Sequence, residues 1–270
     1  MNPKSIFEKN ILFAALNWGN GHVARSIGLI QQLMVQNNAV TIACSVSQQE
    51  IFSVYFPNSN FLFIEDYPFS FSGKGNFSKD LWISRKKLKN HFKYESQWIS
   101  ETVSNYSFDY VISDHRYGFR SDRVHSIFLT HQLNLPLNWW QFPVKWVHTK
   151  LVKRFDELWV LDDVDSSLAG KLSVNSGFKN VHYIGFYSRF MLYEIKNQKE
   201  IDELVICNGP HPYDEYLLLQ FLKEDSKKII ASKRLAEKYT SSQVYSSENW
   251  KECDALIVNA KKIYSYCGYT

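Results

Sequence analysis

The sequence is poor in cysteine, and its cysteines lie far apart. Cys44, Cys207, Cys253 and Cys267 form no C-x-x-C pair and have no histidine at a metal-binding spacing. This pattern excludes a disulfide framework and gives no indication of a zinc site. It fits a reducing, cytoplasmic environment.

Long apolar runs and a strong charge of one sign are also missing. No uninterrupted apolar run approaches the ~18 residues of a membrane-spanning helix, and residues 1–9 lack the apolar core of a signal peptide. The net charge of +4 is small, so we expect no nucleic-acid partner. Asp162-Asp163 and Asp163-x-Asp165 are the nearest approach to a metal-binding Asp-x-Asp pair. Helix capping explains them more simply, so we expect no metal and no other cofactor.

What is present is the composition of a folded globular protein. The 270 residues are 45% hydrophobic and 16% aromatic, an aromatic content that is high for a water-soluble chain. This length has room for a large core and for more than one domain.

A junction near the N-terminus combines an apolar run, a polar loop and a helical pattern. Residues 11–16 are apolar, two glycines follow, and apolar residues then recur at helical spacing. The N-terminal end of such a helix carries unpaired N–H groups and the positive end of the helix dipole, which favour a phosphate or carboxylate. A cation in the first turn is better tolerated beside an anion. A simple tight turn remains an equal alternative. The candidate residues are Asn17, Gly19, Asn20, Gly21, His22 and Arg25.

The same loop matches the dinucleotide pattern G-x-G-x-x-A through Gly19, Gly21 and Ala24. That interpretation requires a carboxylate near the end of the next strand to hold the ribose. We expect that strand at residues 39–44, and the first carboxylate after it is Glu50. A nicotinamide dinucleotide site therefore ranks low.

Further short apolar runs predict a parallel α/β sheet. We expect strands at 61–64, 110–113, 126–129, 157–161 and 181–185. Polar residues follow these strands, and the carboxyl ends of parallel strands line one ligand-binding crevice. The residues expected there are Asn17, Asp114, His115, Arg116, Thr130, His131, Gln132 and Asp162.

Three segments between these strands have an unusual composition. Residues 70–79 resemble a mobile loop, and residues 81–103 form a basic helical pattern that we interpret as a solvated face. Residues 133–155 combine Trp139, Trp140 and Trp146 with three lysines and Arg154. We favour a buried connection on the sheet, with an interfacial membrane contact or a lipid-linked acceptor groove as the alternative.

A second unit is expected after a charged linker at residues 196–203. Strands are predicted at 204–207, 228–231 and 255–258, and a helix at 213–222. The loop 208–212, with Gly209 and His211, resembles the first glycine loop as a possible diphosphate cradle or a plain turn. We expect a first domain at 1–190 and a partial second domain at 191–270, because the predicted strands are too few for a complete one of ~100–150 residues.

Several motifs, in order along nearly the whole chain, resemble those of bacterial glycosyltransferases of the GT-B type that are related to MurG. They are Asn17-Trp18-Gly19-x-Gly21-His22 with Arg25, Ser113 to Gly118, Thr130 to Leu133, Phe155 to Val160, and Tyr183 to Phe190. The motif at 114–118 reads D-H-R-Y-G here, where that group more often has D-N-R-Y-G.

The resemblance implies two Rossmann-like domains, with the acceptor on the first and a nucleotide-activated sugar mostly on the second. His22 and Asp114 are then candidates for the base that deprotonates an acceptor hydroxyl. The other residues implied in substrate binding include those of the glycine loop and His115, Arg116, His131, Gln132, Ser188, Arg189, Gly209 and His211. Arg116 or Arg189 would offset the negative charge on the leaving diphosphate.

The resemblance has two departures. His211 stands where the group commonly has glutamate, and the segment expected to hold the donor ribose does not follow Cys267-Gly268-Tyr269. From the resemblance as a whole we expect a glycosyltransferase that moves a sugar to a hydroxyl of a lipid or surface glycan, in the cytoplasm or at the inner face of the membrane. The alternatives are a non-catalytic glycan- or nucleotide-binding remnant and, ranked lower, a nucleotide-sugar epimerase.

Overall fold

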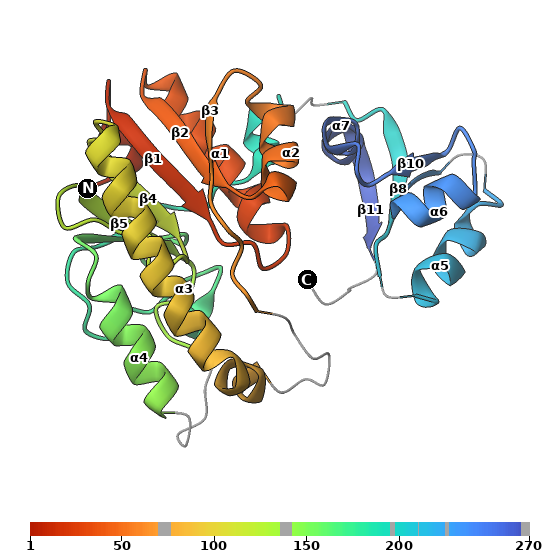
Figure 1. Ribbon diagram of the computed structural model, residues 1–270. Coiled ribbons are helices and arrows are strands. Elements are labelled where there is room, and N and C mark those ends of the chain that lie inside the picture. The colour runs from red at the N-terminus through yellow and green to blue at the C-terminus, as the bar shows by residue number, and fades with distance from the viewer. Residues whose placement is uncertain (70–76, 136–141, 195–197, 210, 225–226, 266–270) are drawn as a thin grey trace. The chain divides into compact units, whose positions relative to one another are not determined.

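A computed structural model describes residues 1–69, 77–135, 142–194, 198–209, 211–224 and 227–265. The chain forms two compact units, Met1–Arg189 and Phe190–Thr270, each with its own sheet (Figure 1). The linker expected at 196–203 lies partly outside these residues, at 196–197. The end of that stretch was wrongly expected as linker, because Ile201 to Glu203 begin a strand.

The first unit is built on a parallel sheet with strand order β3-β2-β1-β4-β5-β6-β7. Its strands are β1 (Asn10–Ala15), β2 (Ala39–Cys44), β3 (Asn60–Phe63), β4 (Tyr110–Asp114), β5 (His125–Thr130), β6 (Glu157–Val160) and β7 (Val181–Tyr183). The chain adds strands in one direction from β1 and in the other from β4. The order therefore reverses between β1 and β4, at a topological switch point where α/β sheets bind ligands.

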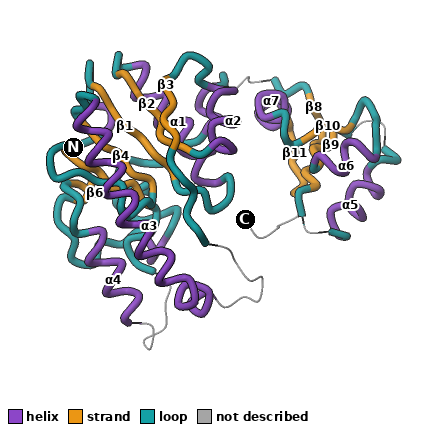
Figure 2. Tube along the Cα trace, in the orientation of Figure 1, coloured by secondary structure: helices purple, strands orange, loops and turns teal. Residues whose placement is uncertain are grey.

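Helices cover both faces of this sheet. They are α1 (Gly21–Val35), α2 (Val46–Tyr55), α3 (Phe77–Asn105) and α4 (Phe142–Val152), with short 3-10 turns η1 (Pro3–Ser5) and η3 (Gly170–Leu172). A further 3-10 turn, η4 (Arg189–Leu192), spans the boundary between the two units. Figures 1 and 2 show α1 and α2 on one side and α3 and α4 on the other. Every residue of β1 after Asn10 is buried, as expected for a central strand covered on both faces.

Two contacts illustrate how the helices are seated. Ile99 of α3 packs with Leu12, Ala14 and Val111 of the central strands. On α1, a Cβ atom at Gly28 would lie 2.5 Å from the backbone oxygen of Ser188. Glycine therefore allows the segment after β7 to lie directly on α1.

The second unit has a smaller parallel sheet with strand order β10-β9-β8-β11. Its elements are β8 (Ile201–Cys207), α5 (Tyr213–Phe221), β9 (Lys228–Ala231), α6 (Lys233–Lys238), β10 (Val244–Ser246), α7 (Trp250–Asn259) and β11 (Ala260–Ser265). The strand predicted at 255–258 is wrong, because these residues form the last turns of α7 and the strand begins at Ala260. A short apolar run has no periodicity that separates a strand from one side of a helix.

The basic helical pattern expected at residues 81–103 corresponds to helix α3. The cations Arg85, Lys86, Lys87, Lys89 and Lys93 of α3 are exposed, as predicted, whereas the neighbouring His91 is buried. The loop expected at 70–79 lies outside the described residues up to 76, and at 77–79 the expectation is wrong, because α3 begins at Phe77.

In the aromatic segment, Trp139 and Trp140 lie outside the described residues. Trp146 of α4 is 56% exposed, so the favoured expectation of a buried connection is wrong at this position. The Lys150 ammonium lies 5.1 Å from the centre of its ring. Among the described helices, none is both long enough and apolar enough to span a bilayer.

Candidate functional site

The first glycine loop and the end of β4 meet at the switch point of the larger sheet. Leu16 donates its N–H to the carbonyl of Asp114, which joins the start of the loop to the last residue of β4. Gly19 has φ +78°, a left-handed conformation that favours glycine. Helix α1 begins at Gly21, and the side chain of Asn20 makes no cap hydrogen bond to it. The loop therefore places His22 and Arg25, on the first turn of α1, beside Asp114.

Asp114 and Arg25 form the centre of this cluster. The Arg25 Nε donates to Asp114 Oδ2 at 2.9 Å, and Nη2 contacts Oδ1, so the guanidinium grips the carboxylate with two nitrogens. The Asp114 side chain is completely buried, whereas that of Arg25 is 17% exposed. The anion that Arg25 requires near the helix N-terminus is thus supplied by the protein itself.

His22 lies over the same carboxylate. Its Nδ1 is 3.1 Å from Asp114 Oδ1 and 2.6 Å from Arg25 Nη2. If Nδ1 carries the proton it donates to Asp114 and leaves the Nε2 lone pair available; if Nδ1 accepts from Arg25, the proton is on Nε2. The His22 side chain is 13% exposed. Of the two candidate bases it is therefore the one that solvent reaches.

Two more histidines from strand ends complete the cluster. His131 follows β5, and its Nδ1 lies 2.6 Å from Arg25 Nη1. His115 follows β4, and its Nε2 lies 2.7 Å from the Thr130 hydroxyl. The His115 ring centre is 5.3 Å from those of both His22 and His131. The predicted convergence of polar strand ends is therefore present for Asp114, His115, Thr130 and His131, and they meet His22 and Arg25 of the first turn of α1.

The charge state of the cluster follows from burial and from the central ion pair. Burial raises the pKa of Asp114, but Arg25 and His22 outweigh it and hold that pKa well below its usual range. Burial and the Arg25 charge lower the pKa of His131 to about 4, and the same causes lower that of His115. At neutral pH the cluster thus has an ionised Asp114 beside neutral His115 and His131.

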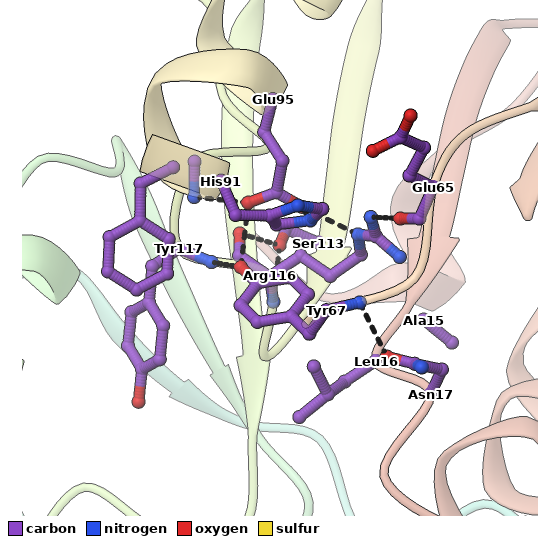
Figure 3. Close-up of polar contacts among 12 residues, drawn as sticks. Ala15, Leu16, Asn17, Glu65, Tyr67, His91, Glu95, Ser113, Arg116 and Tyr117 are labelled. Carbon is purple, nitrogen blue, oxygen red and sulfur yellow. Dashed lines mark hydrogen bonds and ion pairs between the residues drawn. The ribbon is translucent and has the colours of Figure 1, made fainter. Parts of the chain in front are cut away.

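Arg116 corrects the sequence interpretation. We expected it to meet a diphosphate, but its side chain has no solvent exposure and its Nε donates to Glu95 at 2.7 Å. Its Nη2 donates to the carbonyl of Glu65 at 2.7 Å (Figure 3). An arginine buried in this way belongs to a structural ion pair, and a ligand cannot reach its charge.

Glu95, which sequence reasoning missed, holds several segments together behind the site. Besides Arg116 it accepts hydrogen bonds from the Tyr67 hydroxyl at 2.6 Å and from the N–H of Gly118 at 3.0 Å. The backbone N–H of Tyr67 in turn donates to Asn17 Oδ1 at 3.1 Å (Figure 3). Asn17 therefore connects the glycine loop to this second cluster.

A signal for Glu95 was present in the helical pattern. Leu88, Glu95 and Ile99 are spaced by seven and four residues, so they share one side of α3, and all are buried. A carboxylate on the apolar side of a helix implies a buried positive partner. Arg116 is that partner.

The remaining predicted residues lie elsewhere or take part only through their backbone. Gln132 contacts Thr130 through its N–H and carbonyl. The Asp162 carboxylate accepts three backbone N–H groups and the Ser173 hydroxyl, so it caps its own loop. Ser188 lies against Gly28, and Arg189 begins η4.

Gly209 and His211 belong to the second unit, at the carboxyl end of β8. His211 is exposed, and its Nδ1 lies 3.7 Å from carboxylate oxygens of both Asp214 and Glu215. These two acids occupy the first turn of α5. Negative charges there compete with a diphosphate for the positive end of the helix dipole. Within the described ranges, no group of three or more His, Cys, Asp or Glu side chains is arranged to hold a metal ion.

Comparison with known proteins gives a fold and no family. No family model and no curated protein sequence matches the chain. Among solved structures, the chain is similar to the glycotransferase of kitacinnamycin, with a TM-score of 0.61 and 14% identity over 96% of this chain and 76% of that one. It is also similar to CalG4, the calicheamicin glycosyltransferase, with a TM-score of 0.52 and 12% identity over 96% and 74% of the two chains.

A third similar structure is a Listeria monocytogenes protein assigned as a UDP-N-acetylglucosamine 2-epimerase. Its TM-score is 0.54, with 8% identity over 97% of this chain and 75% of that one. These likenesses, together with the two parallel sheets, confirm the expected α/β, Rossmann-like fold class: the chain has a GT-B-like fold.

Proposed function

We propose that this protein transfers a sugar from a nucleotide-diphosphate sugar to an acceptor hydroxyl, with the acceptor bound by the first unit. The observation that carries the proposal is the pairing of a solvent-reached His22 with a buried, ionised Asp114 at the switch point of the larger sheet. The GT-B-like fold supports the reaction class. The motifs at 113–118 and 183–190 favour a relationship to MurG-like enzymes within it.

In this reaction His22 acts as the general base. With its proton on Nδ1 and donated to Asp114, the Nε2 atom accepts the proton of the acceptor hydroxyl as that oxygen attacks the anomeric carbon. The bond from that carbon to the diphosphate oxygen breaks, and the leaving group takes the electron pair. Asp114 does not itself remove the proton, because it is fully buried. It orients His22 and stabilises the imidazolium that forms.

The donor is assigned mainly to the second unit. Its loop at 208–212, with Gly209 and His211, follows β8 in the same way that the first loop follows β1. Ser188 and Arg189, at the end of the first unit, are further candidates for substrate binding. Since Asp214 and Glu215 lie in the first turn of α5, the diphosphate is bound by backbone groups of the loop more than by that helix end.

The acceptor is a glycan or a lipid-linked sugar. Trp146 and Val147 are exposed on α4 beside Lys145 and Lys150, a combination suited to the interface of an anionic membrane. A peripheral contact there would present the first unit to a lipid-linked acceptor at the cytoplasmic face.

The test is transfer by the full chain, measured by mass spectrometry with panels of nucleotide sugars and glycan acceptors. We expect product from the wild-type chain and a kcat that is lower by a factor of ~10²–10⁴ for His22→Ala. His125→Ala, at the opposite edge of the same sheet, is the matched control and should retain activity. Equal activity of His22→Ala and the wild type would contradict the proposal.

The alternative is a non-catalytic remnant that binds a glycan or a nucleotide. The acidic first turn of α5 favours it, because that helix start is unsuited to a diphosphate. Calorimetry that shows glycan binding lost in His22→Ala, without any transfer by the wild type, would support this alternative. Turnover of a nucleotide sugar without acceptor would indicate an epimerase instead.

A further inference from the structure

A charged cavity lies at the edge of the larger sheet that is opposite to the cluster around Asp114. Its lining comes from α3, from the loop before β5 and from the chain just before β6, and its volume is about 250 Å³. The loop contributes Arg120 and Arg123, and the third segment contributes Arg154. Because β5 and β6 begin at His125 and Glu157, these groups lie at the amino ends of the strands.

The charges in this cavity are unbalanced. Three guanidinium groups line it, and Asp122 is the one acid among its lining residues. Asp122 pairs with Arg120, but its own side chain is 86% exposed. Arg123 is exposed and uses one nitrogen, Nη1, to donate to the Ser104 hydroxyl at 2.9 Å. The cavity therefore has a net excess of about two positive charges, counted over these four residues.

One donor in this group lacks a partner. The Arg120 side chain is only 12% exposed, and its Nε is a buried nitrogen with no hydrogen-bond partner among the residues that the structure describes. A buried N–H without an acceptor is unfavourable, so this arginine is suited to a further oxygen ligand. Planar guanidinium groups pair with two oxygens of a phosphate at once.

The loop that carries Arg120 and Arg123 is held in place by hydrogen bonds from its backbone N–H groups to serine hydroxyls and a carbonyl. The N–H of Ser121 donates to the Ser126 hydroxyl at 2.9 Å, and the N–H of Arg123 donates to the Ser121 hydroxyl at 3.0 Å. Arg120 donates its N–H to the carbonyl of Gly118 at 2.9 Å. A loop fixed in this way loses little entropy when a ligand binds to it.

We propose that this cavity binds a phosphate group through Arg120, Arg123 and Arg154. The carboxylate of Asp122 occupies part of the site in the free protein, and the phosphate takes its place on Arg120 while Asp122 turns out into solvent. The site is independent of the sugar-transfer proposal, since it shares no residue with the cluster around Asp114. The volume accommodates a phosphate together with a small attached group or water molecules.

The test is titration of the full chain with inorganic phosphate at constant ionic strength. Calorimetry measures the binding, and the NMR signals of the arginine Nε–H groups report which arginines take part. We expect saturable binding, a shifted Arg120 Nε–H signal, and affinity about tenfold weaker for Arg154→Ala. The matched control is Lys153→Ala, which removes an equal charge from the exposed neighbouring residue outside the cavity. Asp122→Ala should bind phosphate more tightly than the wild type, because it removes the competing carboxylate.

Three results would overturn the proposal. They are the absence of saturable binding, an equal loss of affinity in Lys153→Ala and Arg154→Ala, or weaker binding by Asp122→Ala. Parallel titrations with glucose 6-phosphate, and with phosphatidylcholine vesicles containing one fifth phosphatidic acid, distinguish a soluble phosphate ester from a lipid headgroup. Arg123→Ala provides a second variant, which should weaken phosphate binding as Arg154→Ala does; both residues are exposed, so neither substitution removes the partly buried arginine.

Discussion

Glu95 of α3 and Arg116 after β4 form an ion pair in which neither side chain is exposed, with 2.7 Å between Oε1 and Nε. The pair joins helix α3 to the loop that follows Asp114. The Tyr67 hydroxyl donates a hydrogen bond to the other carboxylate oxygen of Glu95, Oε2. The Arg116 guanidinium also lies 5.2 Å from the centre of the Tyr67 ring. Among the described residues, each charge is therefore compensated mainly by the other and by a few fixed dipoles.

Removal of Glu95 should strongly destabilise the first unit. Glu95→Ala leaves the Arg116 guanidinium buried without a counter-charge, which costs about 3–5 kcal/mol of unfolding free energy. Urea unfolding followed by near-ultraviolet circular dichroism measures the loss. Glu101→Ala, on the exposed side of the same helix, should cost less than about 1 kcal/mol. Similar losses for the two variants would show that the buried pair is unimportant.

His115 should tolerate asparagine better than valine. Its φ of +59° is in the left-handed region, which asparagine and histidine accept and β-branched residues avoid. We expect His115→Val to be about 1–2 kcal/mol less stable than His115→Asn. The same two substitutions at Lys89, an exposed position within helix α3, should differ little, because valine and asparagine have similar helix propensities. Equal stabilities at position 115 would contradict this explanation of D-H-R-Y-G beside D-N-R-Y-G.

Gly118 should be intolerant of any side chain. A Cβ atom there would lie 2.5 Å from the carbonyl oxygen of Phe92 and 2.7 Å from the Glu95 carboxylate. Gly118→Ala should therefore cost roughly 1–3 kcal/mol, because helix α3 must move away. At Gly21 a Cβ meets no atom within 4 Å, so Gly21→Ala should be neutral or slightly stabilising. Thermal unfolding of both variants decides the point, and an unaffected Gly118→Ala would refute the close approach.

Acid should destabilise the first unit through its buried neutral histidines. Burial lowers the pKa of His148 from 6.5 to about 4. As the pH falls from 6.5 towards 4, the unfolded chain takes up a proton that the folded chain does not, so stability decreases by up to roughly 1.4 kcal/mol per pH unit. His91, whose pKa burial and the Arg116 charge lower to about 4, acts in the same direction.

The measurement is the unfolding free energy as a function of pH. His148→Gln should flatten its slope between pH 6.5 and about 4, since the residue no longer titrates in the unfolded chain. Thr149→Gln, next in the same helix, changes no titratable group and should leave the slope unchanged. An unchanged slope in His148→Gln would show that this histidine is protonated in the folded state.

The fold class and the edge of the sheet that carries the candidate site could be predicted from the sequence. Short apolar runs separated by helical patterns specify a parallel sheet, and the polar residues that follow those runs must meet at one edge. That reasoning predicts that Asp114, His115, Thr130 and His131 lie together, as they do in the fold. It failed at 255–258, where four apolar residues have no periodicity and the packing of α7 decided their conformation.

The partners of the charged residues were decided only by the tertiary structure. In the sequence, Arg25 and Arg116 are both cations near strand ends, and both are candidates for contact with an anionic ligand. In the folded chain Arg25 of α1 forms an ion pair with Asp114 of β4, and Arg116 is buried against Glu95 of α3. Composition and spacing determine which residues arrive at an edge, because they determine strands and helices. Which charges neutralise one another depends on distances of a few ångströms between segments far apart in the chain, and only packing of the helices on the sheet fixes those distances.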